Sequence, residues 1–112
     1  MAKGGFGGFG GGANMQQLMR QAQKMQQDME KAQQELAQTT LEASAGGGMA
    51  VCTVTGMKEI VSIKINPEIV DPEDVELLED TVLAAVKEAI AKAEELYNSK
   101  MGAIAGGMGG MF

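Results

Sequence analysis

The feature that most constrains this chain is a regular apolar seam between Asn14 and Leu36. The segment contains no Gly, Pro or β-branched residue, so its composition favours an uninterrupted α-helix. Its apolar residues recur at alternating steps of three and four, which is the spacing of the a and d positions of a coiled coil. The seam residues are Met15, Leu18, Ala22, Met25, Met29, Ala32 and Leu36. A helix with this seam needs a partner surface, in the same chain or in a second copy.

The segment after this helix predicts a small antiparallel sheet. We expect the first helix to run from residue 14 to about 38. Three short strands should follow it, at about 41–45, 49–55 and 58–66. Gly46–Gly48 and Gly56 supply the turns between the strands. A three-stranded sheet has two edges and one apolar face, so it needs a covering helix or a partner sheet.

A second long helix is expected after Pro67, which ends the last strand. Asp71 is a candidate N-cap and Pro72 suits the first helical position, so this helix should run from 72 to about 101. Its apolar stripe is Val75, Leu78, Val82, Ala85, Val86, Ala89, Ile90, Ala93, Leu96 and Tyr97. Both helices exceed the length of the strands, so part of each should project beyond the sheet.

These elements define one α+β domain, with a long helix on either side of a three-stranded antiparallel sheet in the sequence. We place the domain at residues 14–101. Residues 1–13 and 102–112 are rich in glycine and are expected to be flexible tails. No run of apolar residues is long enough to span a membrane, and the N-terminus lacks the apolar core of a signal peptide. We therefore expect the protein in the cytoplasm, with no membrane partner.

The charge is unevenly distributed along the chain. The formal net charge is -6, yet the first 27 residues contain three bases and no acid. Residues 67–86 contain seven acids and no base, and they account for the excess negative charge. This acidic block is either a carboxylate site for a metal or for acid–base chemistry, or a solvated face that complements the dipole of the second helix. We favour the solvated face, because the acids surround the helix and lack the spacing of a calcium loop.

A basic stripe lies on the first helix, away from the seam. Arg20, Lys24 and Lys31 are separated by helical steps, so they share one face. This face is either a row of phosphate contacts or an ordinary solvated face of a coiled coil. Charge alone favours the solvated face, but the absence of acids before Asp28 and the positive end of the helix dipole give the phosphate contacts equal weight, so both interpretations stay open.

Catalysis has little support in this sequence. The chain has no histidine and one cysteine, so it cannot supply a Cys–His nucleophile, a Cys/His zinc site or an intrachain disulfide. Gly46–Gly48 is not followed by the Lys-Ser/Thr of a phosphate-binding loop. We expect no enzyme activity, no metal, no cofactor and no small-molecule substrate. Cys52 is interpreted as a buried small apolar residue rather than a reactive thiol.

Two further features have both a functional and a structural interpretation. Met15, Met25 and Met29 either form an adaptable surface for another protein or are a soft coiled-coil core, and we favour the core. Phe6 and Phe9 of the first tail either stack on nucleic-acid bases or are ordinary residues of a flexible tail, and we favour the tail.

Four segments together carry a family resemblance. They are Asn14-Met-Gln-Gln-Leu-Met-Arg-Gln-Ala-Gln-Lys-Met-Gln, Val54-Thr-Gly-Met, Ile63-Lys-Ile-Asn-Pro and Leu78-Glu-Asp-Thr-Val-Leu-Ala-Ala-Val-Lys-Glu-Ala. Through them the chain resembles the YbaB/EbfC family of bacterial nucleoid-associated proteins over nearly its whole length. Two positions depart from the family pattern. Asn66 replaces the usual aspartate before Pro67, and the C-terminal tail lacks the prolines of many members.

The resemblance implies a homodimer whose paired long helices project like the arms of tweezers. Family members bind DNA and alter its conformation, and binding is attributed to the projecting helices. Arg20 and Lys24 match basic positions of the first-helix motif, so the resemblance makes them candidate DNA contacts. From charge and expected position on the arms we add Lys31, Lys92 and Lys100, together with Lys3 on the mobile segment that precedes the helix.

The hypothesis from the sequence is therefore a homodimer that binds double-stranded DNA in the bacterial nucleoid and alters its conformation. Such a protein would contribute to nucleoid organisation and to the regulation of gene expression. The alternative is a coiled-coil module that binds another protein, with only incidental DNA contact.

Overall fold

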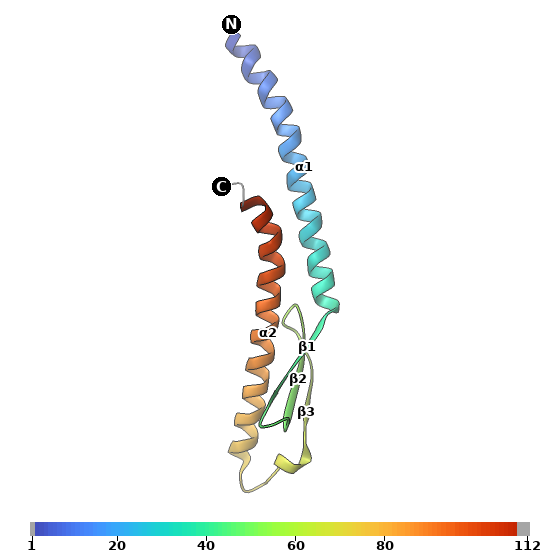
Figure 1. Ribbon diagram of the computed structural model, residues 1–112, viewed down its shortest axis with the longest axis vertical. Coiled ribbons are helices and arrows are strands. Elements are labelled where there is room, and N and C mark those ends of the chain that lie inside the picture. The colour runs from blue at the N-terminus through green and yellow to red at the C-terminus, as the bar shows by residue number, and fades with distance from the viewer. Residues whose placement is uncertain (1, 110–112) are drawn as a thin grey trace.

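Two long helices and a small sheet make up the computed structural model, which describes the backbone of residues 2–109 and the side chains of residues 14–105. The molecule is elongated and measures 86 Å by 22 Å by 17 Å. Figure 1 shows that helix α1 (Ala2–Gln38) runs from one end of the molecule to the start of the sheet. Strands β1 (Thr40–Ala45), β2 (Ala50–Thr55) and β3 (Ile60–Ile65) follow. A short 3₁₀ turn, η1 (Pro67–Ile69), leads to helix α2 (Val75–Gly109), which returns alongside the sheet towards α1. The predicted α+β fold is confirmed.

The sheet is an antiparallel meander in the order β1-β2-β3. Leu41 lies opposite Val54 between the first two strands, and Cys52 lies opposite Ile63 between the last two. Gly46, Gly47 and Gly48 all have positive φ, so the first turn needs the conformational freedom that the sequence supplies there. The strand boundaries agree with the expected ones to within two residues.

Helix α2 covers one face of the sheet through small side chains. Ala85, Ala89 and Ala93 have no exposed surface, and they pack on Cys52 and Val54 of the central strand. Alanine at every fourth position lets the helix approach the sheet closely, so its larger neighbours Val82, Val86 and Ile90 pack at the edges of this core. Six residues of the apolar stripe predicted for the second helix pack in or against this core, whereas Val75 at its start is 51% exposed. The six are Val82, Ala85, Val86, Ala89, Ile90 and Ala93.

Helix α2 leaves the apolar residues of β3 partly exposed. Ile60, Ile63 and Ile65 lie opposite Val54, Cys52 and Ala50 respectively, so all three share the face that α2 packs on. They are nevertheless 50%, 41% and 40% exposed. Part of the apolar face of the sheet is therefore left uncovered within a single copy of the chain.

The first-helix seam is buried only where α1 approaches α2 and the sheet. Ala32 and Leu36 are 3% and 1% exposed, and Met25 is half-buried. Met15 and Leu18, near the other end of the seam, are 59% and 57% exposed. The seam is thus partnered at its base, and farther out on α1 Met15 and Leu18 are left exposed by the described residues.

The helix boundaries differ from the expected ones at three ends. Helix α1 begins at Ala2 rather than near residue 14, and α2 ends at Gly109 rather than near 101. Glycine lowers helix propensity without forbidding a helix, and neither glycine-rich segment contains a proline to block one. The predicted flexibility of residues 1–13 and 102–112 stays a prediction.

The start of α2 is the third difference. The helix begins at Val75, not at Pro72, and Asp74 rather than Asp71 caps it by accepting a hydrogen bond from Leu77 N at 3.2 Å. The Asp71 carboxylate instead accepts from Glu73 N at 2.9 Å, so Pro72 lies in a turn that precedes the helix. Asn66 caps the 3₁₀ turn η1, because its side-chain oxygen accepts a hydrogen bond from Glu68 N at 2.9 Å. The departure from the usual aspartate at this position therefore leaves the turn in place.

Candidate DNA-binding surface

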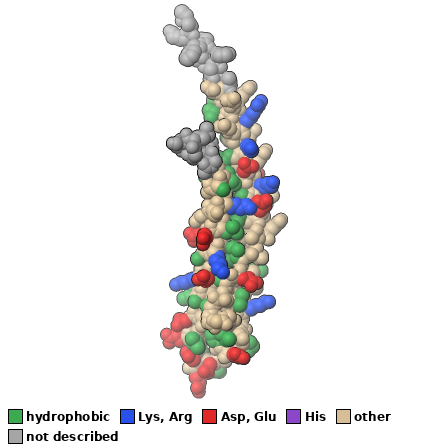
Figure 2. All heavy atoms as spheres, viewed as in Figure 1, with side chains coloured by type: hydrophobic (Ala, Val, Ile, Leu, Met, Phe, Trp, Pro, Cys, Tyr) green, Lys and Arg blue, Asp and Glu red, His purple; other side chains and the backbone are tan. Residues whose placement is uncertain are grey.

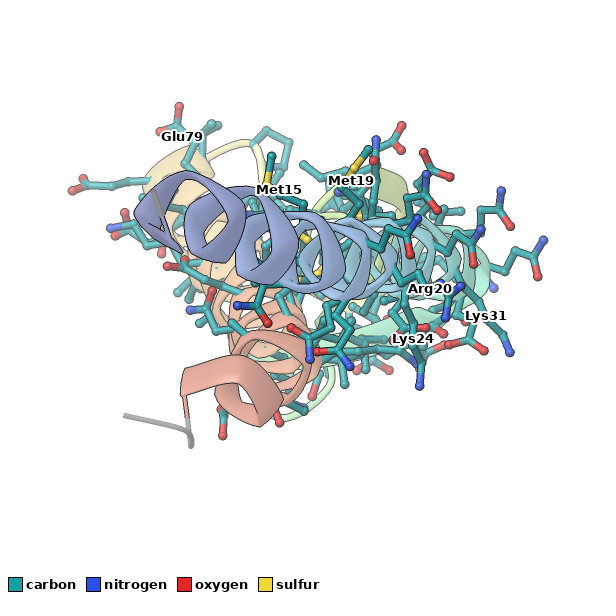
Figure 3. All side chains as sticks on the ribbon, turned by 90° about the horizontal axis from the view of Figure 1, so that it is seen from above. Met15, Met19, Arg20, Lys24, Lys31 and Glu79 are labelled. Atoms are coloured by element: carbon teal, nitrogen blue, oxygen red, sulfur yellow. The ribbon has the colours of Figure 1, made fainter. Side chains whose placement is uncertain are left out.

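Three cations lie together on the exposed part of α1. Arg20, Lys24 and Lys31 are all exposed, and their helical spacing sets them on one side of the helix. Figure 3, which looks down on α1, shows the three side chains projecting outward from the same side. We call Arg20, Lys24 and Lys31 the cation row. Among the described side chains, no residue of this row forms an ion pair.

The cation row is separate from the apolar side chains of the same helix segment. Met15, Leu18 and Met19 are each more than half exposed. In Figure 3, Met15 and Met19 project from a different side of α1 than Arg20, Lys24 and Lys31. The outer part of α1 therefore presents a charged side and an apolar side, both accessible to another molecule.

Two other candidate cations are engaged within the chain. The Lys92 ammonium donates to the backbone oxygen of Glu42 in β1 at 3.0 Å. Lys100 Nζ lies 2.8 Å from Glu35 Oε1, which joins α2 to α1 through an ion pair. The hydrogen bond and the charge of Lys100 lower the pKa of Glu35, and Lys31 adds a smaller effect in the same direction. Lys92 and Lys100 thus have partners within the described part of the chain, where the cation row forms no ion pair.

A groove lies between the two helices at the level of this ion pair. Its volume is about 320 Å³, and it is lined by Asp28, Lys31, Ala32, Glu35, Lys100, Ala103 and Ile104. The lining contains two cations and two carboxylates, so its charges balance. The groove itself is consequently a poor anion site while Glu35 is ionised.

The acidic block, residues 67–86, lies at the opposite end of the molecule from the exposed outer part of α1, which we call the free part of α1. Figure 2 shows carboxylates gathered around the lower end of the molecule, where Figure 1 places η1 and the start of α2. Two of them, Asp71 and Asp74, cap backbone amides, which supports the interpretation of a solvated helix start. Within residues 14–105, no group of three or more acidic or cysteine side chains is arranged to hold a metal ion. Opposite charges therefore lie at opposite ends of the molecule.

Some sequence-based candidates lie outside the side chains that the structure describes. Lys3, Phe6 and Phe9 belong to this group, so their roles stay predictions. Sequence reasoning also missed Lys58, which has a φ of 68° in the turn between β2 and β3 and lies 4.8 Å from the centre of the Tyr97 ring. It missed Glu35 as the partner of Lys100 as well. Neither contact has a local sequence signal, because each joins residues far apart in the chain.

The fold and the cation row together define a class: a small α+β protein whose long first helix bears a row of exposed cations and projects from a three-stranded sheet. A sequence model of the YbaB/EbfC DNA-binding family matches residues 11–108, and the chain belongs to this family. The solved structure of an uncharacterized protein from Helicobacter pylori shares the fold, with a TM-score of 0.65 and 22% identity. That match covers 71% of this chain and 84% of the Helicobacter protein.

Close relatives extend the match to nearly the entire chain. A nucleoid-associated protein of Ruminiclostridium cellulolyticum is 60% identical over 99% of this chain and 96% of its own length. A nucleoid-associated protein of Clostridium botulinum is 61% identical over the full length of both chains. Neither helix has a segment, within the described residues, that is apolar enough to cross a membrane.

Proposed function

We propose that this protein binds double-stranded DNA as a homodimer, through the cation row on the free part of α1. The carrying observation is the row itself: Arg20, Lys24 and Lys31 are exposed on one side of a projecting helix. Membership of a DNA-binding family supports phosphate as the target of these cations. The names of the close relatives support a role in the bacterial nucleoid, hence in the cytoplasm. We extend the proposal to nucleoid organisation and regulation of gene expression.

The homodimer is supported by the apolar surface that one copy leaves exposed. Ile60, Ile63 and Ile65 continue the apolar face of the sheet beyond the edge of α2. Exposed apolar surface of this kind marks an interface in soluble proteins. A second copy packed on β3 would cover these residues and would give the assembly two projecting arms.

The proposed mechanism is electrostatic. Each arm presents its cation row to the phosphates, while the acidic block lies at the other end of the molecule, away from DNA. If each arm neutralises about two to three phosphates, log K should fall against log salt with a slope of roughly -4 to -5. Affinity should be modest, because the formal net charge of -6 opposes approach to DNA. Two arms on one duplex would give the dimer a means of altering DNA conformation.

The test is salt-titrated binding of a short duplex by the wild type and by the double variant Arg20→Ala/Lys24→Ala. Loss of two phosphate contacts per arm should weaken binding and move the slope towards zero by about three to four. The matched control is Lys64→Ala/Lys87→Ala, which removes two exposed cations from the body of the molecule. The control should retain the wild-type slope. Equal affinity and slope in the wild type and the arm variant would exclude the cation row as the DNA contact.

A second candidate function is a protein-interaction module. The exposed apolar side of α1, at Met15, Leu18 and Met19, favours it because methionine adapts to varied partner surfaces. This candidate predicts weak DNA binding at physiological salt and loss of a specific protein complex in Met15→Ser/Met19→Ser. The same variant should bind DNA like the wild type if the cation row acts alone.

A further inference from the structure

We propose that Glu35 is an internal brake on DNA binding, because its carboxylate occupies Lys100 and competes with phosphate for that ammonium. The inference rests on the proposed DNA-binding function of the arms. It adds a regulating residue that is not itself a cation and that does not belong to the cation row. It also explains how Lys100, a cation close to the same helix, differs from Arg20, Lys24 and Lys31.

The geometry follows from the antiparallel course of α1 and α2. The end of α2 returns beside α1, so Lys100 meets Glu35 across the interface at 2.8 Å (Figure 1). Both side chains remain open to solvent, with 37% of Lys100 and 50% of Glu35 exposed. A phosphate could therefore approach Lys100 from outside without any unfolding of the two helices.

The groove connects this pair to the cation row. Lys31, the last member of the row, lies one helical turn before Glu35 and lines the same groove as Lys100. With Glu35 ionised, the groove holds two cations and two carboxylates. Without its charge, Lys31 and Lys100 would face the groove against Asp28 alone. The groove would then extend the positive surface of α1 onto α2.

The brake should be partial. An exposed ion pair is weak and screened by salt, so a duplex with many phosphates can displace the carboxylate. The carboxylate has the advantage of being held beside Lys100 in the same molecule. Competition of this kind lowers affinity and salt dependence without abolishing binding. Lys92 is a different case, since its partner is the neutral backbone oxygen of Glu42.

A purely structural role for the ion pair predicts a different change in DNA affinity when Glu35 is removed. If Glu35 only fastens α1 to α2, its removal loosens the arm and leaves DNA affinity unchanged or lower. If Glu35 is a brake, its removal frees a cation and strengthens binding. The sign of the change in affinity therefore separates the two roles.

The experiment compares salt-titrated duplex binding by the wild type, Glu35→Gln and Glu30→Gln. Glu30→Gln is the matched control, because it removes the same charge from the exposed surface of α1 and Glu30 has no ion pair among the described side chains. Glu35→Gln should bind a few-fold more tightly at low salt, with a slope steeper by about one per arm. Glu30→Gln should keep the wild-type slope. Equal behaviour of the two glutamine variants would overturn the proposal.

Lys100→Ala is then introduced into the wild type and into Glu35→Gln, which completes a double-mutant cycle. In the wild type it should change binding little, because Lys100 is already occupied. In Glu35→Gln it should cancel the gain in affinity and the steeper slope. A gain that persists in Glu35→Gln/Lys100→Ala would exclude competition for Lys100. Thermal unfolding of every variant shows whether each remains folded.

The two proposals fail in different ways. If Arg20→Ala/Lys24→Ala binds DNA like the wild type, the function assigned to the cation row is wrong. If that variant loses affinity but Glu35→Gln equals Glu30→Gln, the cation row stands and the brake is wrong.

Discussion

Gly56 lies directly against Leu36, at the junction where the first helix meets the end of the second strand. Gly56 N donates to Leu36 O at 2.9 Å and to Thr39 O at 3.0 Å. A Cβ atom on Gly56 would stand 2.8 Å from both Leu36 O and Leu36 Cδ2. Leu36 is itself 1% exposed. This contact therefore fixes where the arm leaves the sheet.

Gly56→Ala should destabilise the protein by about 1–3 kcal/mol, because the added methyl group must displace the backbone of α1. Gly102→Ala is the control, since a Cβ there meets nothing within 4 Å. Replacing a helical glycine with alanine should stabilise the chain by about 0.5–1 kcal/mol. Urea unfolding of both variants measures the difference. Equal stability of Gly56→Ala and the wild type would show that the junction accommodates the methyl group without loss of stability.

Ala89 tests the close packing of α2 on the sheet. Its side chain has no exposed surface, and the core around it contains Cys52 and Val54. Ala89→Leu should lower the free energy of unfolding by about 1–3 kcal/mol, because the larger side chain forces the helix away from the strands. Ala84→Leu, on the exposed side of α2, is the matched control and should change stability by less than about 0.5 kcal/mol. Comparable losses in the two variants would contradict the packing argument.

Most of the fold could be predicted from local signals. Glycines at 46–48 mark a turn that requires positive φ, and the alanine-rich stripe of α2 marks the side that packs on the sheet. The predicted helix start at Pro72, with Asp71 as its cap, was wrong because two nearby aspartates can both accept from backbone amides. Asp71 accepts within the preceding turn, and Asp74 accepts at the helix start. The length of the helices at the glycine-rich ends also had no reliable local signal, since glycine permits several conformations.

The candidate site could be predicted only in part. Helical periodicity alone places Arg20, Lys24 and Lys31 on one side of α1, because it depends on residues of one element. The engagement of Lys100 by Glu35 depends on the register between two helices that are far apart in sequence. Periodicity carries no information on that register. The same holds for Ile63, whose exposure depends on how far α2 extends across the sheet.

Cys52 should be unreactive in the folded protein. The side chain has no exposed surface, and burial raises the pKa of its thiol, so little thiolate forms near neutral pH. A thiol reagent should modify Cys52 slowly under native conditions and rapidly in denaturant. Labelling in the presence of increasing urea should follow the unfolding transition. Fast labelling of the native protein would show that the core opens at the centre of the sheet.

The Glu35–Lys100 pair predicts a pH dependence of stability. Lys100 lowers the pKa of Glu35 below its ordinary value of 4.5, so the folded state favours the ionised carboxylate. Its stabilising contribution is present above pH 4.5 and is lost as the pH falls through the lower pKa of the folded protein. The wild type should thus be more stable than Glu35→Gln near neutral pH, and the two should converge in acid. Urea midpoints over this range measure the difference, and Lys100→Ala should remove the pH-dependent part.

The uncovered isoleucines of β3 predict the site of dimerisation. Ile63 is 41% exposed on the face that α2 packs on, while its neighbour Ser62 points to the other face of the same strand. An aspartate at Ile63 would place a charge within an apolar interface, so Ile63→Asp should sediment as a monomer. Ser62→Asp adds the same charge one residue away and should keep the oligomeric state of the wild type. Because avidity requires two linked arms, the monomeric variant should also bind a duplex more weakly, with a salt slope about half that of the dimer. A dimer that survives Ile63→Asp would exclude the uncovered face of β3 as the dimer interface.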